Sequence, residues 1–319
     1  STDMAVETTT FSNNCADTWF RDIMSDCVLC PRACHVNRLA GQTGYCGQTA
    51  ELMAARASLH YWEEPCISGT SGSGTVFFSG CNLRCVFCQN HNIALGKAGR
   101  VIAPEHLAEI FLQLQEQGAN NINLVTPTHF LPQIVIALEQ AKQKGLHLPI
   151  VYNTGSYESP EALRHLEGLV DIYLPDLKYF SPELSTAYSH APDYFETACA
   201  AISEMYRQVG DPVIDEDTGL MQHGMIVRHL LLPGQTKDSK KILRYLHETY
   251  GDHIYISIMN QYTPLPQVAD IEALNRTVTP EEYDRVLRFA ERIGIERGFR
   301  QEGTTASESF IPEFDESGL

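Results

Sequence analysis

Three cysteines, Cys81, Cys85 and Cys88, share one short stretch, and they constrain this chain more than any other feature. The run 74–80 before them is β-branched and aromatic and is bounded by glycines, which predicts a buried strand ending where the cysteines begin. A 4Fe–4S cluster held only by protein uses four thiolates, so three close ones predict an iron left open for a small molecule. A zinc site completed by a histidine such as His91 is the alternative. Zinc ligands, however, usually come as paired C-x2-C knuckles or a Cys/His alternation.

The residues around these cysteines resemble the signature of the radical S-adenosylmethionine (SAM) superfamily. Residues 79–85 and 87–90 are similar to the cluster loop of the pyruvate formate-lyase activating enzymes, within a wider resemblance over residues 27–312 to an activating-enzyme-like branch with an N-terminal Cys-rich segment. The resemblance implies that SAM chelates the open iron, with Phe87 beside its adenine. It also implies reductive cleavage of SAM to methionine and a 5′-deoxyadenosyl radical that abstracts a substrate hydrogen. An electron donor of the flavodoxin or ferredoxin type would supply the electron.

A second group of cysteines, Cys27, Cys30, Cys34 and Cys46, has the spacing C-x2-C-x3-C-x11-C. A second 4Fe–4S cluster fits this compact spacing, which includes a Cys-Pro pair. Structural zinc fits equally well by ligand count. We favour the cluster, because ten cysteines without a visible secretion signal indicate metal or redox chemistry in a reducing cytoplasm.

Composition excludes several other classes of protein. The net charge of −17 over 319 residues argues against non-specific nucleic-acid binding, which relies on lysine and arginine. No apolar run reaches the roughly 18 residues of a membrane span. Residues 1–10 lack the basic and apolar regions of a secretory signal, so we expect a cytoplasmic protein.

From residue 74 onward, strand and helix patterns alternate, which is typical of β/α units. We expect six strands, at residues 74–80, 121–125, 149–152, 170–174, 225–232 and 254–259. Six units predict a partial (β/α)6 TIM barrel, which the family resemblance also implies. The expected organisation is a leader (1–26), a Cys-rich metal-binding segment with its connector (27–73), the barrel (74–300) and a C-terminal tail (301–319).

Polar residues follow several of the predicted strands, and function should gather at these carboxyl ends. The candidate SAM-binding residues, with Phe87, are Asn90, Thr126, Thr128, His129, Asn153, Thr154, Asp176, Lys178, Arg228 and Asn260. Asp176 and Lys178 match an Asp-x-Lys of the similar activating enzymes, whereas Asn153 replaces an aspartate and weakens the case for a cation site. The alternative for Arg228 and Asp176 is a buried ion pair. The alternative for His129 is a structural role in which its ring is hydrogen-bonded.

Three functions remain open from the sequence. The first is an activase that takes hydrogen from a backbone glycine of a glycyl radical enzyme. The second is a radical SAM enzyme that modifies a small molecule or peptide. The third is an iron–sulfur electron-transfer protein without SAM chemistry, which the open three-cysteine site disfavours.

Overall fold

One mixed sheet organises the computed structural model, which describes residues 15–300, 316, 318 and 319. Its strands are β1 (Met53–His60), β2 (Ser73–Phe78), β3 (Arg100–Val101), β4 (Ile122–Val125), β5 (Ile150–Thr154), β6 (Ile172–Pro175), β7 (Val213–Ile214), β8 (Met221–Leu230), β9 (Tyr255–Met259) and β10 (Gly298–Arg300). They lie in the order β10-β9-β8-β6-β5-β4-β2-β1-β3, with β7 paired to β8. The sheet is open rather than closed into a full barrel, as the sequence predicted.

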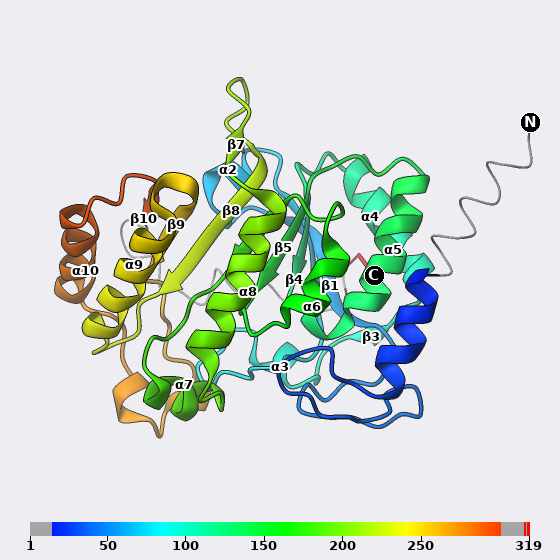
Figure 1. Ribbon diagram of the computed structural model, residues 1–319, viewed down its shortest axis with the longest axis horizontal. Helices are drawn as coiled ribbons and strands as arrows, with labels where there is room; N and C mark the ends of the chain where they lie inside the picture. The colour runs from blue at the N-terminus through cyan, green and yellow to red at the C-terminus, as the bar shows by residue number, and fades with distance from the viewer. Residues whose placement is uncertain (1–14, 301–315, 317) are drawn as a thin grey trace, which may run out of the picture.

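Parallel pairing runs from β2 through β4, β5, β6, β8 and β9 to β10, whereas β1 is antiparallel to β2. Long helices cover the outer face, and the arrow of β8 points to the end of the molecule where α3, α7 and the N-terminal segment lie (Figure 1). This is the carboxyl end of the parallel strands. The six strands expected from the sequence are therefore present, and the fold class is confirmed.

The labelled α-helices are α2 (Pro65–Ser68), α3 (His91–Ala94), α4 (Pro104–Glu116), α5 (Leu131–Gln143), α6 (Pro160–Leu163), α7 (Pro182–Ser189), α8 (Tyr194–Val209), α9 (Thr236–Tyr250) and α10 (Pro280–Arg292). Residues 15–25 are also helical. Short 3-10 turns occupy Thr128–Phe130, Arg164–Leu166, Gly251–His253, Pro266–Val268 and Glu272–Leu274. Proline stands in the first turn of α4, α6, α7 and α10, where its missing N–H costs no helical hydrogen bond. No described helix is both long and apolar enough to cross a membrane.

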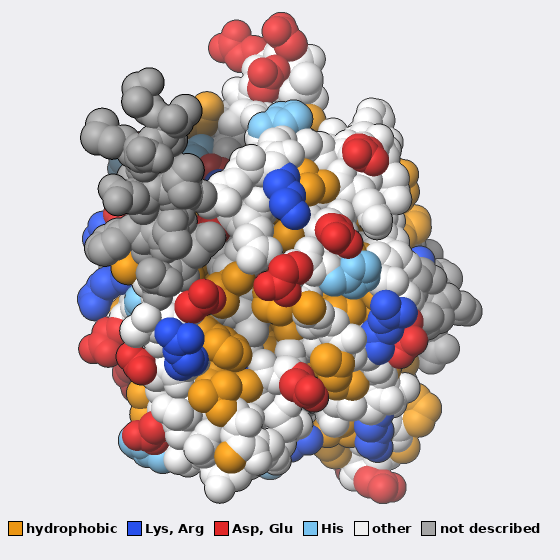
Figure 2. All heavy atoms as spheres, turned by 90° about the vertical axis from the view of Figure 1, so that its right-hand side faces the viewer, with side chains coloured by type: hydrophobic (Ala, Val, Ile, Leu, Met, Phe, Trp, Pro, Cys, Tyr) orange, Lys and Arg blue, Asp and Glu red, His pale blue; other side chains and the backbone are white. Residues whose placement is uncertain are grey.

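The structure adds two features to the sequence-based expectation. The presumed connector before residue 74 contains β1 and α2, so the sheet starts earlier than expected. Residues 211–224, an acidic stretch of the sequence, form a hairpin made by β7 and the start of β8. Its exposed tip carries Asp215, Glu216 and Asp217 and projects from the end opposite the α7 end, where Figure 2 shows its carboxylates together. The expected domain boundaries stay predictions, and residues 301–315 and 317 of the tail lie outside the described part.

Candidate active site

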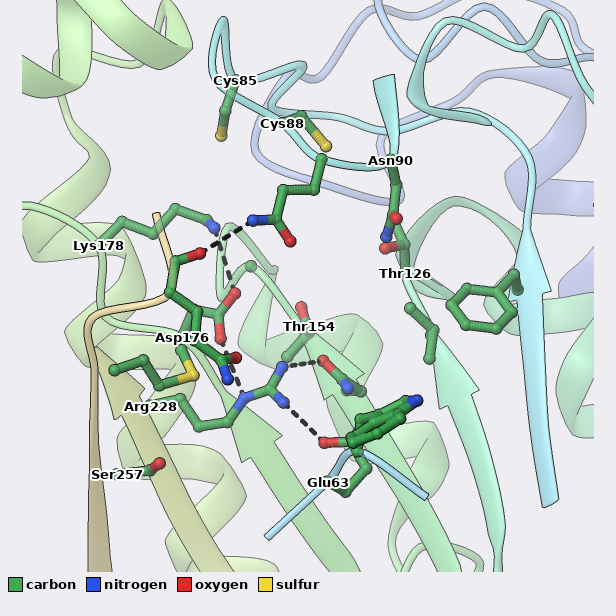
Figure 3. A pocket seen from close by; sticks show the side chains of 18 of the residues that line it. Glu63, Cys85, Cys88, Asn90, Thr126, Thr154, Asp176, Lys178, Arg228 and Ser257 are labelled. Carbon is green, nitrogen blue, oxygen red and sulfur yellow. Dashed lines mark hydrogen bonds and ion pairs between the residues drawn. The ribbon is translucent and has the colours of Figure 1, made fainter. Parts of the chain in front are cut away.

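A cavity of about 410 Å³ lies on the concave inner face of the sheet. Its lining comes from the cluster loop, from the ends of β4, β5 and β6, and from inward-facing residues of β8 and β9. Figure 3 shows Cys85 and Cys88 on one side of this cavity, Arg228 and Glu63 on the other, and Lys178 between them. The sequence thus predicted correctly that the unusual residues of several strand ends meet in one place.

The three cysteines of the loop all line this cavity, and all are free thiols. Two left-handed residues shape the loop: Gly80 has φ 86° and Arg84 has φ 53°. The sulfurs also receive hydrogen bonds. The backbone N–H of Leu83 donates to Cys81 Sγ at 3.4 Å, and the Ser189 hydroxyl donates to Cys85 Sγ at 2.9 Å. Donors aimed at sulfur stabilise a thiolate over a thiol.

Burial keeps the thiols of Cys81 and Cys88 protonated while no metal is bound, because it raises the pKa of each. It raises the pKa of Cys88 to about 12, with further increases from the neighbouring Cys85 and Cys81. The pKa of Cys81 is also raised, first by burial and then by Cys85. Metal binding must therefore displace protons, and thiolates gathered this closely are stable only when they share a cation.

Arg228 on β8 is held from three sides. Its Nε donates to Asp176 Oδ1 at 3.3 Å, its Nη1 to Glu63 Oε2 at 2.9 Å and its Nη2 to Asn153 Oδ1 at 2.6 Å. Burial alone would lower the pKa of Arg228, but the Asp176 and Glu63 carboxylates outweigh it and raise that pKa. The alternative of a buried ion pair between Arg228 and Asp176 is what the structure contains.

Lys178 lies at the same level, nearer the cysteines. Its Nζ donates to Asp176 Oδ2 at 3.2 Å. Burial would lower the pKa of Lys178, but the Asp176 carboxylate and the nearby Cys85 raise it above the ordinary value, so this side chain stays charged. An ammonium has three donors, and Asp176 uses one of them. Lys178 therefore keeps hydrogen-bonding capacity toward the cavity.

Thr128 and Thr154 line the cavity, but their hydroxyls serve a carboxyl group that the sequence did not single out. Thr128 Oγ1 donates to Glu158 Oε2 at 3.0 Å, and Thr154 Oγ1 donates to the same atom at 2.7 Å. Glu158 is 1% exposed, and burial raises its pKa to about 7 despite these hydrogen bonds. Thr126 and Asn90 also line the cavity.

Three candidates do not line the cavity: Phe87, His129 and Asn260. Phe87 packs edge-on against Tyr179, Tyr188 and Tyr262. His129 is buried with Nε2 at 2.5 Å from the Ser79 carbonyl, and burial lowers its pKa to about 3. The structural alternative for His129 is therefore the arrangement observed.

The wall opposite the cysteines comes from residues 60–65, which the sequence suggested were only a connector. Glu63, Glu64 and Trp62 line the cavity there, and Trp62 is 62% exposed. Burial raises the pKa of Glu64, although the Arg228 charge opposes this. The signal for this wall was an acidic pair, Glu63-Glu64, directly after two aromatic residues, but no spacing rule assigns such a pair to a cavity.

A buried cation lies beside the second group of cysteines. Arg38 is 1% exposed, its guanidinium donates to the Gln48 and Thr49 carbonyls, and its Nη1 lies 3.9 Å from Cys27 Sγ. No carboxylate of the described residues contacts Arg38. A buried charge needs a counter-charge, and thiolates at Cys27 and its neighbours would supply it.

The four N-terminal cysteines lie close enough to influence one another. Burial raises the pKa of Cys30 to about 11, and Cys46 and Cys27 add to the effect. Cys34 and Cys27 likewise help to raise the pKa of Cys46. Within residues 15–300, no group of three His, Cys, Asp or Glu side chains is placed to hold a single metal ion. The cluster loop likewise contains no such group. This does not count against a cubane there, because each thiolate of a 4Fe–4S cluster binds a different iron.

Comparisons with known proteins agree with this geometry. The family model of the radical SAM superfamily matches residues 75–246. An uncharacterized protein of Methanocaldococcus jannaschii is 27% identical over 286 residues, covering 86% of this chain and 77% of the relative.

Two solved structures show distant similarity. One is a domain of pyruvate-formate lyase-activating enzyme from Bacteroides vulgatus (13% identity, TM-score 0.41, 58% of this chain and 100% of the other). The other is Streptococcus suis SuiB bound to precursor peptide SuiA (14% identity, TM-score 0.48, 70% of this chain and 46% of the other).

Since the family model covers more than half of the chain, the protein belongs to the radical SAM superfamily. The resemblance noted from the sequence is confirmed. Membership implies SAM-dependent radical chemistry with a 4Fe–4S cluster, and the residues present fit such a group. Three free thiols on one loop, two of them receiving hydrogen bonds at sulfur, face a cavity that also holds a charged lysine.

Proposed function

We propose that Cys81, Cys85 and Cys88 hold a 4Fe–4S cluster with one iron left for SAM, and that the protein cleaves SAM reductively. Products would be methionine and a 5′-deoxyadenosyl radical that abstracts a substrate hydrogen. The cluster supplies the electron, received from a flavodoxin- or ferredoxin-type donor, while the protein orients SAM and excludes water. The observation that carries this proposal is the placement of three thiols of one loop at the wall of a cavity lined by polar strand ends.

Within this proposal, Lys178 rather than Arg228 binds the SAM carboxylate. All three sides of the Arg228 guanidinium are occupied by Asp176, Glu63 and Asn153. Lys178 lies beside the cysteines and keeps unused donors. Asn90 and Thr126 complete the polar wall around the same part of the cavity. Thr128 and Thr154 act indirectly, by fixing Glu158 behind that wall.

We also propose that Cys27, Cys30, Cys34 and Cys46 hold a second 4Fe–4S cluster, with zinc as the alternative. Arg38 supports an anionic group here, because its buried guanidinium has no carboxylate partner among the described residues. The compact spacing of these cysteines, with its Cys-Pro pair, favours a cluster over zinc. The anionic group that we expect beside Arg38 is the set of four thiolates with their bound metal.

The substrate we propose is a backbone glycine of a partner protein, which makes the protein a glycyl-radical-enzyme activase. The cavity of about 410 Å³ is near the small end of ligand pockets, which span roughly 300–1,000 Å³. SAM and the cluster must share it. The remaining room suits a protruding chain segment better than a second whole molecule, and a peptide substrate would use the same opening.

The first experiment measures iron, sulfide and zinc in anaerobically prepared protein and then 5′-deoxyadenosine after reduction with dithionite in the presence of SAM. About eight irons with nucleoside release support two clusters, at four irons each. About four irons and one zinc would assign zinc to the N-terminal site. Reducible iron without SAM cleavage would overturn the proposal in favour of an electron-transfer protein.

Replacing Cys85 by Ala should abolish release of 5′-deoxyadenosine, because two thiolates cannot hold the cubane in the required position. Cys199 is a suitable control: it lies in α8, outside both groups, so Cys199→Ala should leave nucleoside release unchanged. Full activity of Cys85→Ala would rule out the three-thiolate site.

The activase proposal is tested by electron paramagnetic resonance after the reduced protein and SAM are mixed with pyruvate formate-lyase, or with a glycyl radical enzyme encoded beside it. A glycyl radical signal that depends on SAM supports activation. Rapid nucleoside release without a glycyl radical in either protein would favour the small-molecule or peptide alternative.

A further inference from the structure

Arg32, in the N-terminal Cys-rich segment, grips the part of the barrel that surrounds the cluster loop. Its Nε donates to the Asn82 carbonyl at 2.8 Å, inside that loop. Its Nη1 and Nη2 donate to the carbonyls of His190 and Ser189 at 2.5 and 2.9 Å. One side chain therefore joins the N-terminal segment to two parts of the barrel that are far apart in the sequence, residue 82 and residues 189–190.

The surroundings of Arg32 suit a fixed cation. The guanidinium carbon lies 3.8 Å from the ring centroid of Tyr45 and 5.0 Å from that of Tyr157. Ser189 is the last residue of α7, where the helix dipole is negative and a cation is stabilised. No carboxylate of the described residues pairs with Arg32, so these carbonyls and rings hold it.

The same contacts reach the cluster sulfurs. Ser189, whose carbonyl accepts from Arg32, donates its hydroxyl to Cys85 Sγ at 2.9 Å. Asn82, adjacent to Cys81, donates its amide to the Tyr157 carbonyl at 2.6 Å, and its side chain lies near enough to Cys30 to oppose the rise in that thiol's pKa. The two groups of cysteines are thus linked through one asparagine.

A second bond and a close approach strengthen this junction. The Tyr45 hydroxyl donates to the Leu83 carbonyl at 3.0 Å. Gly80 packs so tightly that a Cβ there would lie 2.8 Å from the Cys46 carbonyl. Both contacts join residues beside Cys46 to the cluster loop.

We propose that the N-terminal segment is a clamp on the SAM-cluster loop, with Arg32 as its positioning residue, and that metal binding by Cys27, Cys30, Cys34 and Cys46 tightens the clamp. Residues 26–52 contain neither helix nor strand, so the order of this segment depends on its metal. Metal loading at one group of cysteines and order in the other loop are then coupled. This inference rests on the proposed function of both groups.

The test compares four proteins, each reconstituted with iron and sulfide: wild type, Arg32→Met, Cys34→Ala and Arg288→Met. Cys34→Ala removes one N-terminal ligand without changing a contact of the cluster loop, since the Cys34 sulfur packs against Gly44 and the Cys27 carbonyl. Arg288 is the matched control, because it is 72% exposed on α10. The readouts are hydrogen exchange of amides 81–88 and the change that SAM causes in the electron paramagnetic resonance spectrum of the reduced protein.

The clamp predicts that exchange of amides 81–88 accelerates at least about tenfold in Arg32→Met, the factor for losing one charge-assisted hydrogen bond. Cys34→Ala should accelerate the same amides, although its mutation lies elsewhere. In both variants the spectral response should require more SAM, and Arg288→Met should match wild type. Arg32→Lys should not restore the wild-type exchange, because lysine lacks the fork that reaches three carbonyls.

If Arg32→Met does not fold, Tyr45→Phe provides the same test, since it removes only the hydroxyl bond to Leu83 and keeps the ring under Arg32. Unchanged exchange of amides 81–88 in Cys34→Ala, with N-terminal metal lost, would overturn the clamp. So would acceleration confined to residues 27–46. A wild-type protein whose spectrum does not respond to SAM would instead overturn the proposed function, so the two failures are distinguishable.

Discussion

Arg228 lines the cavity as part of a buried network of polar and charged side chains. Its guanidinium is shared by Asp176, Glu63 and Asn153. Removing one member of such a buried network leaves the other charges unpaired. The carboxylates therefore depend on the arginine as much as it depends on them.

Arg228→Met should lower the free energy of unfolding by about 3–5 kcal/mol, because the buried Asp176 and Glu63 carboxylates lose their partner. Thermal denaturation at neutral pH measures this, with Arg288→Met as an exposed control. A variant as stable as wild type, but with weakened SAM binding, would show that Arg228 is a SAM ligand instead.

Glu158 gives the protein a pH dependence that can be measured without its substrate. Burial raises its pKa to about 7, above the unfolded value near 4.3, so the folded state binds more protons than the unfolded state between these values. The contribution of this group is therefore complete below about pH 4 and is lost as the pH rises through 7. Glu158→Gln should flatten the fall in melting temperature between pH 5 and 8, and a parallel pH profile would contradict this.

The sequence predicted which residues of the candidate site lie near one another, but not which groups they hydrogen-bond. Residues at strand ends met as expected, because parallel strands place their carboxyl ends along one edge. Yet the hydroxyls of Thr128 and Thr154, which line the cavity, donate to Glu158. The chain turns back at Ser156, whose φ is 72°, and brings Glu158 behind the threonines. Glycine in a sequence indicates a possible left-handed turn, whereas serine does not.

At the scale of elements, α10 has the most complete start signal. Thr279 Oγ1 accepts from the Glu282 N–H at 3.1 Å, and Glu282 Oε1 accepts from the Thr279 N–H at 3.0 Å. Glu282 also binds Arg276 at 2.7 Å and the Gly234 N–H at 2.6 Å, so the cap ties α10 to two loops. The Thr-x-x-Glu pattern from Thr279 to Glu282 is the sequence signature of a capping box, and the structure forms it.

Thr279→Ala should reduce stability by about 1 kcal/mol, since one helix N–H loses its side-chain acceptor. For a domain of this size the expected fall in melting temperature is roughly 2–4 °C. Differential scanning calorimetry measures it, and Thr279→Ser is the control that keeps the hydroxyl. Equal losses in both variants would show that the methyl group, not the cap, matters.

The elements that the sequence missed share a physical cause. β1 includes Ala54, Ala55 and Ala57, and alanine is a weak strand former, so its pairing with β2 is a tertiary effect. The acidic run before β8 likewise reads as a loop, although its flanks pair as a hairpin. By contrast, a proline in the first turn marks the start of α4 and of α7 in the sequence itself.

At the scale of the whole molecule, metal should govern how the N-terminal segment is held. Removing iron with a chelator under anaerobic conditions should lower the melting temperature and open residues 27–52 to limited proteolysis, because this stretch has no helix or strand of its own. Mass spectrometry of the fragments locates the cuts, and cleavage within the barrel strands serves as the reference. Identical fragments before and after iron removal would contradict the expectation.

The position of Arg32 also bears on biosynthesis. The cysteines up to Cys46 leave the ribosome well before Ser189 and His190, the carbonyls on which Arg32 closes. At roughly 5–20 residues per second, translation of the intervening chain takes on the order of 7–30 s. During that interval the thiols of Cys27, Cys30, Cys34 and Cys46 are made, but the carbonyls that Arg32 binds are not. Metal delivered to these thiols during synthesis would therefore reach them while the nascent chain still lacks the other half of the junction.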